Sequence, residues 1–182
     1  MRSDPDDIPR TFRHGPSDPI VFADGPGTWV EIQMSASVDD VWALVTDIDL
    51  PARFSEEFLG ASWSSGGPEL DASFVGRNQH PAIGEWQTEC FVDEFEPGQV
   101  FGWAVSDVDN PGARWRFRLR PTDDGCVLRF EVSLGPGPSG TTRAIETMPE
   151  KEARIIGRRL RELHTNMERT VTGMRELLRA KQ

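Results

Sequence analysis

A long stretch of two-residue alternation most constrains how this chain folds. After Gly60, apolar and polar residues alternate for about seventy residues. In the run 114–120 every arginine falls on one face, while Trp115, Phe117 and Leu119 fall on the other. This pattern predicts a β-sheet with one wet face and one buried face. Turn-forming breaks divide the stretch into expected strands at 61–65, 72–80, 85–95, 100–106, 113–120 and 126–134.

The C-terminal segment changes to a helical period. Its apolar residues recur at spacings of three and four: Ile155, Ile156, Leu160, Leu163, Met167, Val171, Met174, Leu177 and Leu178. They predict a helix over about 150–180, on the order of 45 Å long. A one-sided sheet must bury its apolar face, and no other segment is long enough to cover it. A short helical turn is expected before it, at 141–148.

The segment before the sheet also shows start and stop signals. Residues 29–34 read as a strand, and Ser37 follows as the expected N-cap of a helix that reaches Ile48, with Asp40 in the capping-box position. Pro51 suits a first helical turn, so a second short helix is expected over 51–58.

Length and composition favour one intracellular domain. Residues 1–27, rich in proline and glycine, are expected to form a flexible arm, which leaves 28–182 as the folded domain. A net charge of −10 argues against nucleic acid as a partner. We expect neither a membrane segment nor a signal peptide, because no long apolar stretch is present. Cys90 and Cys126 are too few for a disulfide framework, and with the three histidines they form no metal-ligand spacing, so we expect a cytoplasmic protein without metal or cofactor.

Three segments resemble a known superfamily. Residues 30–48 (VEIQMSASVDDVWALVTDI) are similar to the opening of the SRPBCC superfamily, which includes START lipid-transfer domains, the birch-pollen-allergen fold and polyketide cyclase/dehydrases. Residues 76–86 and 134–140 resemble uncharacterised actinobacterial members. The resemblance implies the α+β helix-grip fold, in which a curved antiparallel sheet of about seven strands wraps a long C-terminal helix. It also implies a groove for lipids, polyketides or hormones, and it supplies no universal catalytic motif.

Apolar residues on the inner faces are the candidate lining of that groove. A curved sheet that meets a helix leaves room that side chains fill only partly. The candidates are Phe74, Trp86, Trp103, Trp115, Phe117, Phe130, Leu163 and Met167, and each also fits an ordinary core position.

Three polar residues are candidates for ligand contact or proton transfer. Asn78 and His80 share a strand face with Phe74 and are expected to point into the groove, where they would bond a ligand carbonyl or hydroxyl; a solvent-exposed strand end is the alternative. His164 lies on the apolar stripe of the helix, as a groove residue or as a core histidine. If His80 and His164 approach each other, an acid–base pair becomes available; on the enzyme hypothesis, Asn78, His80 or His164 moves protons. The glycine- and proline-rich segment 135–140 lacks the lysine of a phosphate-binding loop and reads as a connector or a lid.

Three functions therefore stay open from sequence. The first is non-catalytic binding of a small hydrophobic molecule. The second is an enzyme of the cyclase/aromatase kind that uses a groove histidine. The third is a protein-interaction module whose pocket has collapsed. The oligomeric state, monomer or homodimer, is open as well.

Overall fold

The computed structural model describes residues 20–180 of the 182-residue chain. Its strands are β1 (Gly27–Met34), β2 (Phe58–Ser65), β3 (Ser73–His80), β4 (Gly84–Glu96), β5 (Val100–Val105), β6 (Ala113–Thr122) and β7 (Gly125–Leu134). Its α-helices are α1 (Val38–Val45), α2 (Gly140–Thr147) and α3 (Glu152–Arg179), and its 3-10 turns are η1 (Phe22–Asp24), η2 (Leu50–Arg53) and η3 (Pro149–Lys151).

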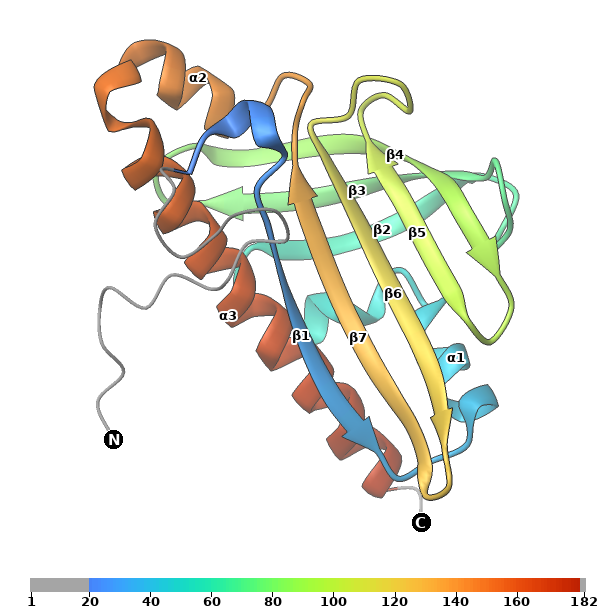
Figure 1. Cartoon of the computed structure of the whole chain (residues 1–182). Coiled ribbons are helices and arrows are strands. Elements are labelled where there is room, and N and C mark those ends of the chain that lie inside the picture. Colours follow the sequence, from blue (N-terminus) through green and yellow to red (C-terminus); the bar gives the residue numbers. More distant parts are fainter. Residues whose placement is uncertain (1–19, 181–182) are drawn as a thin grey trace, which may run out of the picture.

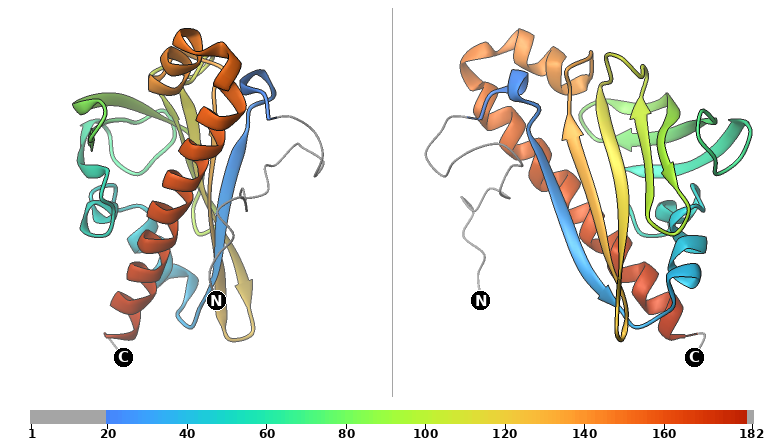
Figure 2. Two further views of the ribbon diagram at one scale, coloured as in Figure 1. Left: turned by 90° about the vertical axis from the view of Figure 1, so that its left-hand side faces the viewer. Right: turned by 45° about the vertical axis from the view of Figure 1, so that its right-hand side comes forward.

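One antiparallel sheet and one long helix organise the molecule (Figure 1). The strand order is β1-β7-β6-β5-β4-β3-β2, so β1 and β2 form the two edges. Helix α3 packs mainly against β1, and strands β2 to β4 curl round its other side (Figure 2). The expected helix-grip architecture is confirmed.

The inner faces of the strands follow the predicted alternation. In β6, Phe117 is buried and faces Phe130 of β7 in the strand register, while Leu119 faces Leu128. These side chains join Leu160 and other stripe residues of α3 in one core. The period of two in the sequence therefore does set which face is buried.

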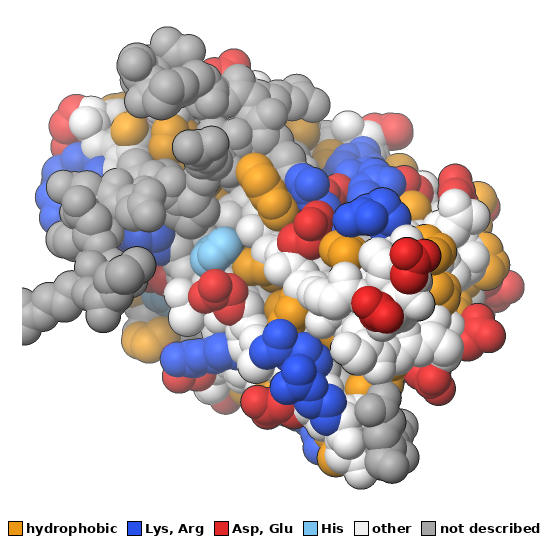
Figure 3. Space-filling view, turned by 60° about the horizontal axis from the view of Figure 1, so that its bottom comes forward, with side chains coloured by type: hydrophobic (Ala, Val, Ile, Leu, Met, Phe, Trp, Pro, Cys, Tyr) orange, Lys and Arg blue, Asp and Glu red, His pale blue; other side chains and the backbone are white. Residues whose placement is uncertain are grey.

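The surface is highly charged. On the face seen in Figure 3, acidic and basic side chains are interspersed, with apolar side chains in small groups between them. Among residues 20–180, the large apolar side chains that are exposed are Leu70, Ile83 and Val108, each in a different turn between strands.

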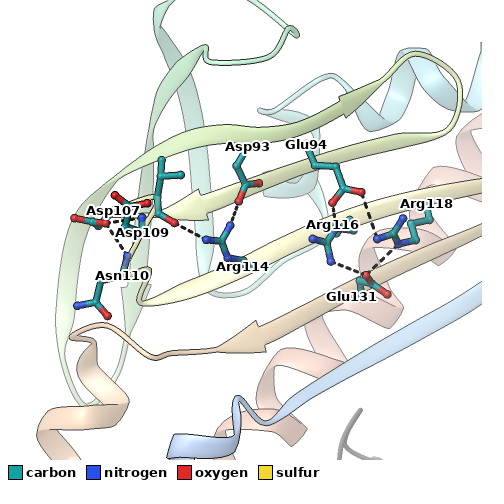
Figure 4. A network of polar contacts seen from close by, with 10 residues as sticks. Asp93, Glu94, Asp107, Asp109, Asn110, Arg114, Arg116, Arg118 and Glu131 are labelled. Carbon is teal, nitrogen blue, oxygen red and sulfur yellow. Dashed lines mark hydrogen bonds and ion pairs between the residues drawn. The ribbon is translucent and has the colours of Figure 1, made fainter.

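The outer face of the sheet holds a ladder of ion pairs (Figure 4). Arginines of β6 reach Glu131 on the adjacent strand β7 and, across β5, Asp93 and Glu94 on β4. Glu131 of β7 is only 9% exposed, and its carboxylate lies within 3.3 Å of nitrogens of Arg116, Arg118 and Arg129. Arg114, Arg116 and Arg118 are thus paired within the protein, on the outer face of the sheet.

The segment between α1 and β2 differs from the prediction. Ser37 does cap α1 by accepting the backbone N–H of Asp40, but the helix ends at Val45. The expected second short helix is present as the 3-10 turn η2, with Pro51 in its first turn, but it is shorter than 51–58: η2 ends at Arg53, and Phe58 already begins β2. The cause is local, because the Ser55 hydroxyl accepts the backbone N–H groups of both Glu57 and Phe58, which favours a turn over a helix.

The N-terminal arm falls largely outside the described residues, since 1–19 are not among them. Within 20–27 the chain is packed. Phe22 donates its backbone N–H to Glu152 at the start of α3, at 2.8 Å, and its ring lies against the core. The packed chain therefore starts before Thr28.

Gly173 allows α3 to approach Phe54, directly after η2, and this contact yields a test. A β-carbon at Gly173 would lie 2.3 Å from the ring of Phe54. Glycine-to-alanine changes inside helices usually stabilise by about 1 kcal/mol. Here Gly173→Ala is expected to destabilise by about 1–3 kcal/mol, because the added methyl overpacks the contact.

Chemical denaturation of a double-mutant cycle checks this expectation. In a Phe54→Ala background, Gly173→Ala should become neutral or stabilising. Equal destabilisation in both backgrounds would contradict the proposed steric cause.

Candidate ligand pocket

A cavity of about 130 Å³ lies between α3, the inner faces of β3 to β7, and the segment from α1 to β2. Eight of the residues expected at a groove border it: Phe74, Asn78, Trp103, Trp115, Phe117, Phe130, Leu163 and Met167. Phe58 and Phe101 also border it. Phe101 lies on the same face of β5 as Trp103, so the alternation of the strand already indicated that it points inward. Phe58 was missed because residues up to 58 were expected to be helical, whereas Phe58 begins β2.

The aromatic side chains around the cavity are paired across neighbouring strands. Trp103 and Trp115 face each other in the register and stack with ring centres 6.3 Å apart. Phe117 and Phe130 do the same at 4.0 Å, and Phe74 meets Trp103 edge-on. These rings are core and lining at the same time, because each supports its neighbour on one side and faces the cavity on another.

Two polar side chains enter this aromatic wall. Asn78 of β3 donates its side-chain N–H to the hydroxyl of Thr88 on β4, at 3.3 Å, and both border the cavity. Gly76 lies opposite Thr88 in the register and adds no side chain of its own. Thr88 was not among the sequence candidates, although it has the same strand parity as Trp86.

The edge of the cavity is fastened by the η2–β2 loop (residues 54–57). Glu57 forms a bidentate pair with Arg159 of α3, with both N–O distances 2.6 Å. Burial alone would lower the pKa of Arg159, but the hydrogen bonds and charge of Glu57 outweigh it, and the pKa is raised. Asn166 accepts the backbone N–H of Glu56 beside it. The loop is therefore tied to the helix at the edge of the cavity.

The two candidate histidines do not border the cavity. His80 shares the inner face of β3 with Asn78 but lies two residues further on, where its Nε2 is 3.6 Å from Glu162 and its Nδ1 accepts the backbone N–H of Ala82. His164 turns toward β1, with its Nδ1 3.1 Å from the Thr28 hydroxyl, and borders a separate, more open groove. The conditional acid–base pair is therefore not formed.

Two further candidates lie away from the cavity as well. Trp86 faces Asn78 in the register but is only partly buried and does not border it. The connector 135–140 does not border it either, and its Gly137 N–H bonds the Pro111 carbonyl instead. Residues 135–140 therefore do not form a lid over the cavity.

Cys90 borders the cavity, but its thiol is expected to react slowly. Burial raises the pKa of the Cys90 thiol from its ordinary value of 9.0 to about 12. Burial also raises the pKa of Cys126. Because the thiolate is the nucleophile, Cys90 is a wall residue here and not a reactive group.

Candidate metal ligands do not cluster in the described part of the chain. Within residues 20–180, no group of three or more His, Cys, Asp or Glu side chains is placed to hold a metal ion. None of the helices in that same part combines the length and apolar composition needed to cross a membrane.

Thiol reactivity tests the environment of Cys90. A pKa raised by about three units lowers the thiolate fraction at pH 8 roughly a thousandfold. We expect neither cysteine to react with iodoacetamide in the folded protein, and both to react in guanidinium chloride. Ser64→Cys, at an exposed position of β2, supplies the reactive control. Labelling of Cys90 as fast as the thiol introduced by that substitution would contradict the buried site.

The Glu57–Arg159 pair gives a second test. Glu57→Gln keeps the shape but removes the charge, and should destabilise the protein by about 2 kcal/mol in chemical denaturation because Arg159 loses a charge-assisted partner. Glu56→Gln is the matched control: Glu56 pairs with Arg169, but both side chains are far more exposed, so the change should cost under about 0.5 kcal/mol. An equal loss of unfolding free energy in the two variants would show that the Glu57–Arg159 pair stabilises the protein no more than the exposed Glu56–Arg169 pair does.

Comparison with known proteins places the chain in a family. The family model described as polyketide cyclase / dehydrase and lipid transport matches residues 29–168, which is most of the chain. No curated protein matches the sequence.

Solved structures share the fold. A polyketide-cyclase-like protein from Corynebacterium glutamicum is 27% identical with a TM-score of 0.60, over 85% of this chain and 92% of that one. A protein from Chromobacterium violaceum is 14% identical with a TM-score of 0.55, over 83% and 95% of the two chains. The di-domain ARO/CYC protein of the steffimycin biosynthetic pathway is 17% identical with a TM-score of 0.63, over 86% of this chain and 52% of that one, so this chain spans about half of its length. By sequence match and by architecture, the chain belongs to the polyketide cyclase/dehydrase and lipid-transport family.

Proposed function

We propose that this protein binds one small, mainly apolar molecule in the cavity between the sheet and α3. The observation that carries the proposal is the cavity itself, because space surrounded by aromatic side chains is left open in the middle of the core. Its volume of about 130 Å³ is close to that of engineered cavities that hold benzene and below the range for drug-sized ligands. The proposed occupant is therefore about the size of one ring, not a long acyl chain.

Burial of the ligand supplies the affinity. A ring of phenylalanine size removes about 150–250 Å² from water, which at ~25 cal/mol per Å² amounts to about 4–6 kcal/mol. This corresponds to dissociation constants from about 1 mM to tens of micromolar. The name of the family, which joins cyclase/dehydrase with lipid transport, is consistent with apolar ligands.

The lining supports binding without turnover over acid–base catalysis. The titratable side chains at the cavity are Asp47, Glu57 and Cys90. Asp47 accepts the backbone N–H groups of Asp49 and Leu50, Glu57 is held by Arg159, and the Cys90 thiol stays protonated. Histidine, which the enzyme hypothesis required, is not among them.

An interaction module with a collapsed pocket has less support. The cavity is open, and the three exposed large apolar side chains of the described residues lie apart in separate turns. A docking surface for a protein partner usually gathers such residues in one patch.

Titration with toluene tests the proposal on ¹⁵N-labelled full-length protein. We expect the indole N–H signals of Trp103 and Trp115 to shift, with a dissociation constant at or below about 1 mM. Gly76→Val should weaken binding at least tenfold, because its side chain enters the open space. Val75→Ile, on the other face of the same strand, should leave binding unchanged. Toluene that shifts no signal of a lining residue would refute the function.

A further inference from the structure

The polar pair inside the cavity has hydrogen-bonding capacity left over. Asn78 uses one side-chain N–H to bond the Thr88 hydroxyl, and within residues 20–180 no other hydrogen bond reaches either side chain. The side-chain carbonyl oxygen of Asn78 is thus an available acceptor, and the Thr88 hydroxyl proton is an available donor.

The other polar side chains at the cavity are engaged with the protein. Ser55 accepts two backbone N–H groups, Glu57 binds Arg159, and Thr170 donates to the Asn166 carbonyl. Asn166 accepts the N–H of Glu56 at the loop. The acceptor and donor that remain side by side are those of Asn78 and Thr88.

Gly76 keeps the space next to this pair open. A β-carbon at Gly76 would lie 3.8 Å from the Thr88 hydroxyl oxygen and 3.9 Å from the Asn78 side-chain nitrogen. Its contact with Phe58 would be 3.4 Å, so a side chain at this position would stand beside the ring and both polar groups, and glycine leaves them uncovered. The backbone of Gly76 is not in the left-handed region, so conformation does not require glycine here.

We propose that the pocket selects phenols, with the ring against the aromatic wall and the hydroxyl over Gly76, donating to Asn78 and accepting from Thr88. The inference rests on the proposed binding function and adds the ligand class. A hydroxyl is the group that satisfies both partners, since it accepts and donates at once. Flat stacked rings such as Trp103 and Trp115 favour an aromatic body beside it.

Competing head groups fit less well. A ketone or ether accepts only, so it leaves the Asn78 acceptor unpaired in an apolar site. A carboxylate would meet the carboxylates of Asp47 and Glu57, and the guanidinium of Arg159 is already bound by Glu57.

A matched ligand pair tests the inference on the full-length protein. 4-Methylphenol and 1,4-dimethylbenzene differ by a hydroxyl in place of a methyl group, and NMR titration gives both dissociation constants. The readout is the affinity ratio of phenol to hydrocarbon, compared between the native protein and Asn78→Leu/Thr88→Val. This comparison cancels the difference in hydration between the two ligands.

We expect the ratio to fall at least about tenfold in the double variant, while 1,4-dimethylbenzene still binds. In the native protein, the Asn78 side-chain amide signals should shift with the phenol and not with the hydrocarbon. 4-Methylanisole, an acceptor only, should bind about tenfold more weakly than 4-methylphenol. Circular dichroism checks the fold, and Thr88→Val alone, which is nearly isosteric, replaces the double variant if that variant unfolds.

The outcomes separate the two proposals. An unchanged ratio with both ligands bound overturns phenol selectivity and leaves apolar binding in place. An ether that binds as tightly as the phenol also overturns it, because the acceptor of Asn78 is then unused. If neither aromatic ligand binds the native protein, the binding function and the ligand class both fail.

Discussion

The structure depends on a mismatch between the width of the sheet and the width of the helix that covers it. Seven strands span about 29 Å, whereas one helix with its side chains is about 10–12 Å across. Helix α3 packs mainly on β1, at one edge, so β3 and β4 on the far side of the sheet have few close backbone contacts with it. Curvature of the sheet narrows the gap, and large rings and the η2–β2 loop fill most of what remains. The cavity is the space that remains after the sheet has curved and these side chains and the loop have packed.

Aromatic side chains suit this arrangement because they reach far and support one another. In-register pairs such as Trp103 with Trp115 and Phe117 with Phe130 form a continuous wall that keeps its shape beside open space. An unfilled cavity still has a cost, on the order of 3 kcal/mol for about 130 Å³. A core with that cost is consistent with selection for an occupant, and it supports the binding function over tight packing alone.

Charge is kept at the boundaries of this apolar site. The outer face carries the arginine ladder around Glu131, and the loop edge carries the Glu57–Arg159 pair. Between them, Asn78 and Thr88 are the polar groups that point into the aromatic wall with bonding capacity unused. A neutral ligand with one hydroxyl matches that distribution, because it brings no charge into a site where desolvation is expensive.

The sequence by itself determined the elements and their faces. Period-two alternation set the inward side of β5, β6 and β7, the spacing of Leu160 and its neighbours set the inner face of α3, and Asn78 was placed on the inner face by parity alone. Only the tertiary structure decided how far along each strand the cavity extends. His80 has the same parity as Asn78 yet lies past the cavity edge beside Glu162, and His164 turns to Thr28 because a helix face is wider than the pocket. Glu57 and Arg159 are 102 residues apart, so their pairing follows from chain packing and not from any local pattern. Periodicity reports direction within one element, whereas position along the groove depends on the register and curvature of all the elements together.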